Sequence, residues 1–247
     1  ACPVRVLLAV WLAWLSFSAA AAPVRVLQLR DAIGPASADY LKRGIARAGD
    51  DGAALLIIEL DTPGGLDTAM RDIIQAMLAS RVPVVVYVSP DGARAASAGT
   101  YILYAAHIAA MAPATTLGAA TPVAIGMPGS ERKPPPAGPP ASGALVPRGA
   151  APPAPGDAMT ANQVHDAAAF IRGLAEQRGR NAEWAERAVR EAVSLTAVEA
   201  LQQHVIDVLA EDRDDLLRQL DGRRVKVHGV ERTLDTRGAA VELVLPD

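Results

Sequence analysis

The sequence predicts a mixed α/β domain in which short buried strands alternate with helices. Apolar runs rich in Val, Ile and Leu recur through the first half of the chain, and segments with apolar residues at helical spacing separate them. Alternation of this kind is typical of a parallel sheet covered by helices. The 247 residues, 51% of them hydrophobic, also provide ample material for a core.

The first half of the chain is expected to supply three strand and helix pairs. The expected strands span 24–29, 54–59 and 83–88, and the expected helices span 36–48, 66–81 and 98–107. Pro35 is suitably placed to open the first helix, because proline favours the first helical position.

A break separates this half from a mainly helical second half. Residues 126–157 hold ten of the 19 prolines and six of the 20 glycines, which predicts a disordered loop. We interpret it as a linker in preference to a lid over a cleft. After it, the pattern predicts helices over 161–177, 182–192 and 212–220, a short helix opened by the capping-box pair Thr196 and Glu199, and strands over 205–209, 223–227 and 241–245.

The amino-terminal segment has the pattern of an export signal. Arg5 precedes an uncharged apolar run that ends in the small residues 19–22, which predicts a signal peptide over residues 1–21 and an extracytoplasmic location. A retained membrane anchor is the alternative, although the run is short for a span. The only cysteine, Cys2, lies in this segment, so we expect no disulfide in the mature chain.

Charge and composition argue against several classes of function. A net charge of −3 and an aromatic content of 4% disfavour a nucleic-acid partner, which needs clustered positive charge and stacking surfaces. The four histidines are dispersed along the chain, so we expect no metal site. No motif for a cofactor is found, and we expect none.

Two motifs that follow apolar strands carry the chemistry. In Leu60–Gly65, Gly64 and Gly65 adopt backbone angles closed to other residues, so their N–H groups can hold an oxyanion. In Ala95–Thr100, Ser97 lies before a helix with small neighbours, and Ala98 offers a second N–H. Read singly, the first motif is a turn and the second a helix cap. Their order and their positions after two strands instead predict an oxyanion hole and a serine nucleophile.

From about residue 24 to 210 the sequence resembles the ClpP and crotonase superfamily, most closely the membrane-bound NfeD group of ClpP-class serine proteases. Beyond the two motifs, the resemblance rests on residues 117–123, 166–181, 194–201 and 205–207. It implies a spiral of ββα units, Ser97 as nucleophile, and an oxyanion hole from Gly64 or Gly65 with Ala98. It also implies stomatin-like membrane partners and a homodimer. We therefore expect a protease domain over 22–210 and an extension over 211–247 that leads towards a membrane region.

The general base is the point where the sequence departs from the NfeD pattern. The resemblance places the family's Lys four residues before Asp166, where this chain has Asn162, and an amide cannot accept a proton. Two other residues are candidates. Lys133 lies in the Pro-rich loop, where a lysine is ordinarily solvated, and His165 lies one helical turn from Asn162, where a histidine ordinarily makes a local hydrogen bond.

Three functions are compatible with these observations. The first is a membrane-associated serine endopeptidase that cleaves apolar peptide segments of membrane proteins by acyl transfer through Ser97. The second is a degenerate scaffold that binds stomatin-like partners or peptides without cleavage, which Asn162 favours. The third is a crotonase-type acyl-CoA enzyme, which the export signal disfavours because acyl-CoA substrates are cytosolic.

Overall fold

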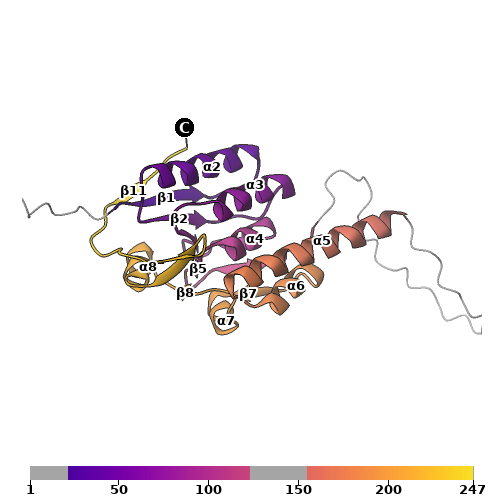
Figure 1. Cartoon of the computed structure of the whole chain (residues 1–247). Helices are drawn as coiled ribbons and strands as arrows, with labels where there is room; N and C mark the ends of the chain where they lie inside the picture. The colour runs from indigo at the N-terminus through magenta and orange to yellow at the C-terminus, as the bar shows by residue number, and fades with distance from the viewer. Residues whose placement is uncertain (1–21, 123–154, 247) are drawn as a thin grey trace, which may run out of the picture.

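Six parallel strands form the centre of the molecule. The computed structural model describes residues 22–122 and 155–246, and in it the main sheet has the order β11-β1-β2-β3-β5-β8 (Figure 1). The strands are β1 (Val24–Leu29), β2 (Leu55–Leu60), β3 (Val84–Val88), β5 (Ile108–Met111), β8 (Val208–Leu209) and β11 (Val241–Leu243). All residues of β2 and β3 are buried, as expected for inner strands of a parallel sheet covered on both faces.

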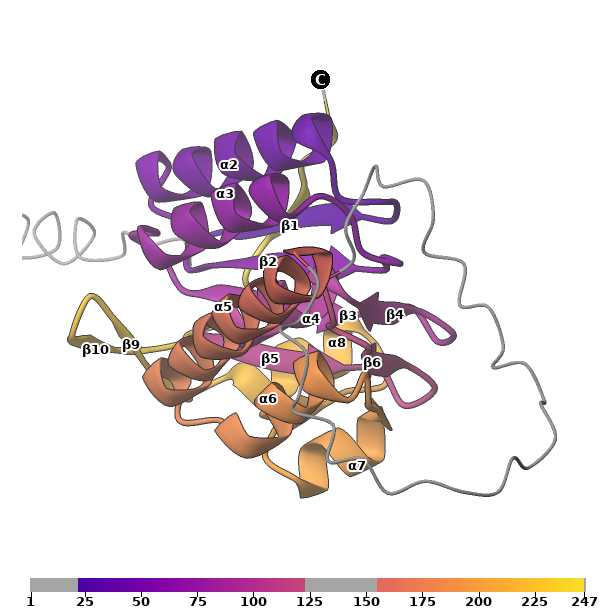
Figure 2. The same ribbon diagram turned by 90° about the vertical axis from the view of Figure 1, so that its right-hand side faces the viewer.

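Helices cover one face of this sheet, and a helix with a hairpin covers the other. The helices are α2 (Pro35–Asp50), α3 (Asp67–Leu78), α4 (Ala98–Ala105), α5 (Pro155–Arg178), α6 (Ala182–Arg190), α7 (Ala197–Gln202) and α8 (Arg213–Leu220). Leu56 and Ile58 point into the core shared with α2 to α7, whereas Leu55 and Ile57 point into the core shared with α8. Strand β9 (Arg224–Val227), paired with β10 (Val230–Thr233), helps to close this second core. Helices α2 to α6 pack each against the next, and α5 is the long helix in Figure 2.

A second, smaller sheet is formed by short strands that lie in the connections between the longer elements. It consists of β4 (Arg94–Ala96), β6 (Thr116–Gly118) and β7 (Ser194–Thr196), and isolated bridges join Thr62 to Ala95 and Ile33 to Gly65. Except for β7, each of these short strands and bridged residues lies between a strand of the main sheet and the helix that follows it. The chain therefore repeats a ββα unit, which confirms the expected spiral.

Most of the expected elements are present, and the differences are in short ones. The structure adds β4, β5, β6, β7 and β10, and it reduces the strand expected over 205–209 to Val208–Leu209. These strands have two to four residues, too few to show periodicity. Helix α5 begins at Pro155, within the segment 126–157 expected to be a loop. The remainder of that segment up to residue 154, and the expected signal peptide over 1–21, lie outside the described residues.

Residues after 210 join the same sheet. Strand β11 pairs in parallel with β1, Tyr40 donates its hydroxyl to the carbonyl of Val244 at 2.6 Å, and Arg25 forms an ion pair with Glu242 at 3.0 Å. In the part of the chain that the structure describes, we find no helix with the length and hydrophobicity needed to span a bilayer.

Candidate active site

Ser97 lies at the turn between β4 and α4 with a strained backbone. Its φ of 51° and ψ of −117° lie outside the regions favoured by residues other than glycine. Its amide donates to the carbonyl of Gly118 at 2.9 Å, and its carbonyl accepts from the amide of Thr100 at 2.9 Å. The side chain makes no capping hydrogen bond to the helix. The cap interpretation of this serine is therefore not what the structure shows, and the serine lies on a sharp strand-to-helix turn of the kind that presents nucleophiles in other folds.

The glycine turn after β2 lies directly against this serine. A Cβ on Gly64 would lie 2.7 Å from the Cβ of Ser97 and 3.2 Å from its Oγ, and Gly64 has a φ of +115°. A Cβ on Gly65 would lie 2.1 Å from the carbonyl oxygen of Ile33. The two motifs that the sequence placed after separate strands therefore meet, and both glycines are required by close contacts.

The hydrogen bonds of this turn distinguish the two glycines. The amide of Gly64 donates to Oγ1 of Thr62 at 3.1 Å, so it is engaged within the turn. Among the described residues, the amides of Gly65 and Ala98 have no acceptor. A pair of free N–H groups beside a serine hydroxyl is the arrangement that stabilises a developing oxyanion. The amides of Gly65 and Ala98 are thus available for this role, whereas that of Gly64 is engaged by Thr62.

Thr100 and Gly118 support the turn, and the sequence analysis did not assign them a role. The buried hydroxyl of Thr100 donates to the carbonyl of Ala95 at 2.8 Å and accepts from the amide of Gly118 at 3.1 Å. A Cβ on Gly118 would lie 2.3 Å from the carbonyl oxygen of Val193. In the sequence, the one indication of this role was that Thr100 is a hydroxyl residue within a mainly apolar helix.

Among the described residues, no contact joins a candidate base to Ser97. His165 is exposed on α5, and its Nδ1 lies 3.4 Å from the guanidinium of Arg190 on α6. Asn162 is exposed one turn earlier on α5, and Lys133 lies outside the described residues. No hydrogen bond joins Ser97 to a Lys or His within residues 22–122 and 155–246.

Tyr101 on α4 packs against Phe170 on α5, with their ring centroids 6.1 Å apart. Burial raises the pKa of Tyr101 well above its ordinary value, and its hydroxyl donates to the carbonyl of Ala120 at 3.0 Å. Arg71 lies 4.5 Å from the ring centroid of Phe170 and pairs with Asp67 and Asp166. Within the described residues, no group of three His, Cys, Asp or Glu residues has the arrangement of a metal site.

The fold, with a serine on a sharp turn against a glycine turn, places the chain in the ClpP-like class. The sequence model of the NfeD1b N-terminal domain matches residues 23–132. The chain is 37% identical over 225 residues to the membrane-bound protease PH1510 of Pyrococcus horikoshii, covering 90% of this chain and 46% of that protein. The chain spans less than half the length of the curated relatives it matches.

Solved structures give the same assignment. A variant of the 1510-N membrane-bound stomatin-specific protease with a serine replaced by alanine superposes with a TM-score of 0.77 at 36% identity, covering 92% of this chain and 100% of that one. A lysine-to-alanine variant in complex with a substrate peptide gives 0.74 at 36% identity, covering 92% and 93%. The ClpP catalytic domain of Plasmodium falciparum, at 14% identity and a TM-score of 0.52, covers 76% and 86% and shares the fold. The chain therefore belongs to the NfeD family, and it shares its fold with ClpP.

Proposed function

We propose that this protein is a membrane-associated serine endopeptidase of the NfeD type, which cleaves apolar peptide segments by acyl transfer through Ser97. The observation that carries the proposal is the strained Ser97 turn held against Gly64, while the amides of Gly65 and Ala98 have no acceptor among the described residues. The names of the related structures, a stomatin-specific protease and a complex with a substrate peptide, support a peptide substrate and a stomatin-like partner.

The site residues divide the reaction between them. The Oγ of Ser97 attacks the peptide carbonyl carbon while its proton passes to a base. This attack forms a tetrahedral intermediate with a negative oxygen. The N–H groups of Gly65 and Ala98 donate to this oxygen, and one such donor is typically worth about 3 kcal/mol. The amine then leaves with a proton, and water hydrolyses the acyl ester to release the second peptide and restore Ser97.

The base is Lys133 or His165 in this proposal, since the amide of Asn162 accepts no proton. A lysine serves only where burial or a neighbouring charge keeps its amine neutral. A histidine needs no such shift, because its ordinary pKa lies near 6.5. The pH profile of cleavage identifies the base only when it is compared with the profiles of the Lys133→Ala and His165→Ala variants.

Labelling by a fluorophosphonate probe and cleavage of an apolar peptide library test the proposal together. We expect Ser97→Ala to abolish both, and either Lys133→Ala or His165→Ala to slow both by about 100-fold or more, as loss of a general base does. Lys42→Ala and Gln163→Ala, which remove another lysine and a neighbour of His165 on α5, are the controls. Cleavage that persists in Ser97→Ala would contradict the proposal.

A degenerate scaffold is the second candidate, and Asn162 at the position of the family's lysine favours it. Such a protein would bind peptides or stomatin-like partners without turning them over. Wild type that binds a library peptide but neither cleaves it nor labels at any pH would favour the scaffold. Asn162→Lys is then the informative variant, since gain of labelling identifies the missing base as the cause.

Export to the extracytoplasmic face of the membrane and assembly as a homodimer complete the proposal. The signal-like pattern over residues 1–21 supports export. Amino-terminal sequencing of the secreted protein tests the cleavage after residue 21, and sedimentation of the purified chain tests the dimer.

A further inference from the structure

A second cleft lies at the far end of helix α4 from Ser97. Its volume is about 440 Å³, and it lies between the turn before β5, the end of α5 and the β9–β10 hairpin. His107 and Arg178 form one wall, and Arg223 and Lys226 form part of the other. Because α4 separates this cleft from the serine, it is distinct from the candidate active site.

The charges that line the cleft do not cancel. Asp207 forms an ion pair with Arg180 at 2.5 Å, and Glu231 forms one with Arg224 at 3.0 Å, so both acidic residues of the lining are already paired. Three cations remain, and none has an acidic partner among the described residues. They are Arg178, Arg223 and Lys226.

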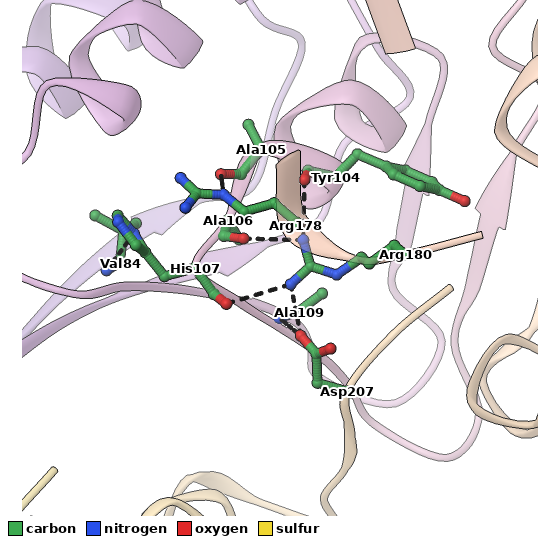
Figure 3. A network of polar contacts seen from close by, with 9 residues as sticks. All are labelled: Val84, Tyr104, Ala105, Ala106, His107, Ala109, Arg178, Arg180 and Asp207. Carbon is green, nitrogen blue, oxygen red and sulfur yellow. Dashed lines mark hydrogen bonds and ion pairs between the residues drawn. The ribbon is translucent and has the colours of Figure 1, made fainter. Parts of the chain in front are cut away.

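Arg178 is held in place without an ion-pair partner among the described residues. Its Nε donates to the carbonyl of Ala105 at 3.0 Å, and its two terminal nitrogens point away from Arg180 and Asp207 (Figure 3). Burial lowers the pKa of Arg178 to about 10; the charge of Arg180 also lowers it, whereas that of Asp207 raises it. Burial also lowers the pKa of His107 to about 3, with smaller contributions from Arg178, His228 and Arg180. The neighbouring cations thus add to the effect of burial at both groups.

We propose that this cleft binds a phosphate group. Three unpaired cations match the charge of a phosphate dianion more closely than that of a single carboxylate. Guanidinium groups such as those of Arg178 and Arg223 also present forked donors that suit phosphate oxygens. The chain has a net charge of −3, so this cluster is a local feature and not a consequence of a basic protein. The inference does not depend on the role of Ser97.

The phosphate group has two chemical sources, an anionic phospholipid headgroup and a soluble phosphate. Calorimetric titration of the full chain with inorganic phosphate at constant ionic strength tests the soluble source. Co-sedimentation with phosphatidylcholine vesicles, with and without phosphatidic acid, tests the lipid source. Saturable binding in either experiment supports the proposal, and vesicle binding without phosphate binding identifies the headgroup.

Substitutions on the hairpin decide whether the cleft is responsible. Arg223→Ala and Lys226→Ala change exposed side chains, and each is expected to weaken binding about tenfold through loss of a charge-assisted contact. Arg232→Ala removes an exposed cation of the same hairpin outside the cleft lining, and it is expected to leave binding unchanged. An equal loss in all three variants would overturn the proposal, as would the absence of saturable binding to both probes.

Discussion

At the scale of single residues, the site depends on two unusual backbone conformations in contact. Ser97 has a φ of 51° and Gly64 a φ of +115°, and conformations of this kind cost about 1–3 kcal/mol each for residues with a side chain. The surrounding hydrogen bonds hold them in place: the amide of Ser97 donates to Gly118, the amide of Thr100 donates to Ser97, and Thr62 and Gly64 bond to each other. In this conformation the hydroxyl of Ser97 makes no helix-capping hydrogen bond.

Gly64→Ala is expected to lower both stability and serine reactivity. The new Cβ would lie 2.7 Å from the Cβ of Ser97, in a backbone conformation that alanine rarely adopts. We expect the free energy of unfolding to fall by about 2 kcal/mol or more, and labelling of Ser97 by a fluorophosphonate to slow. Urea denaturation and labelling rates measure the two effects.

Gly52→Ala is the matched control, because Gly52 has a φ of +65° with nothing within 4 Å of the added Cβ. It is expected to cost about 1 kcal/mol and to leave labelling unchanged. Equal effects of the two variants on labelling would mean that Gly64 does not contact the reactive serine.

At the scale of elements, α4 is held at both ends. Its first turn is bound to β6 through Ser97 and Thr100. The carbonyls at its other end accept hydrogen bonds from Arg178, the last residue of α5, and from Arg180. Arg180, whose side chain is 2% exposed, donates to the carbonyls of Tyr104 and Ala106 at 2.9 Å each (Figure 3). Cations at a helix carboxyl terminus satisfy orphan carbonyls and interact favourably with the dipole.

Arg180→Ala is expected to destabilise the protein by about 3 kcal/mol or more. The change removes the cationic partner of Asp207, whose carboxylate keeps only the amide of Ala109 among the described residues, and it takes the guanidinium donor from the carbonyls of Tyr104 and Ala106. Breaking a buried pair is costly for this reason. Arg180→Lys is expected to recover only part of the loss, since an ammonium cannot reproduce the fork that reaches several acceptors. Urea denaturation of both variants measures the change.

Arg237→Ala is the control for this series. Arg237 is 87% exposed in its pair with Asp221, and surface pairs contribute about 0–1 kcal/mol. If Arg180→Ala proved as mild as Arg237→Ala, the arginine would not be holding the end of α4.

At the scale of the whole molecule, the two ends of the described chain lie side by side in one sheet. The amide of Val24 donates to the carbonyl of Ala240 at 2.8 Å, and the amide of Val244 donates to the carbonyl of Val26 at 2.9 Å. Strand β11 thus pairs with β1 at the edge of the sheet, so that residues from the two ends of the described chain are hydrogen-bonded. The part of the chain after 210 contributes to the stability of the domain that carries the site.

Truncation after Thr236 is expected to lower the free energy of unfolding by about 3 kcal/mol. It removes β11 and its hydrogen bonds to β1, each worth about 1 kcal/mol, together with the acceptor for the hydroxyl of Tyr40. Truncation after Val244 leaves the strand in place and is expected to change stability little. Identical urea midpoints for the two truncated forms would show that β11 adds nothing.

Much of the fold was predictable because its signals are local. The apolar runs at 24–29, 54–59 and 83–88 each became a parallel strand, and the capping box at Thr196 and Glu199 opens α7 as expected. The short strands β4, β5, β6, β7 and β10 were not predicted, since strands such as β5 and β6 form through partners far along the chain. The contact between the guanidinium of Arg190 and Nδ1 of His165 likewise joins two helices that sequence spacing does not relate.

The α/β class and the order of the long elements follow from the sequence alone, because periodicity and backbone freedom depend on neighbouring residues. The sequence also singled out Gly64, Gly65, Ser97 and Ala98 as candidates for the site. Only the tertiary structure decided that the two motifs touch, that the amide of Gly64 is engaged while those of Gly65 and Ala98 remain free, and that unpaired cations gather beyond the end of α4. These features arise from contacts between segments far apart in the chain, and no local pattern encodes which partners will meet.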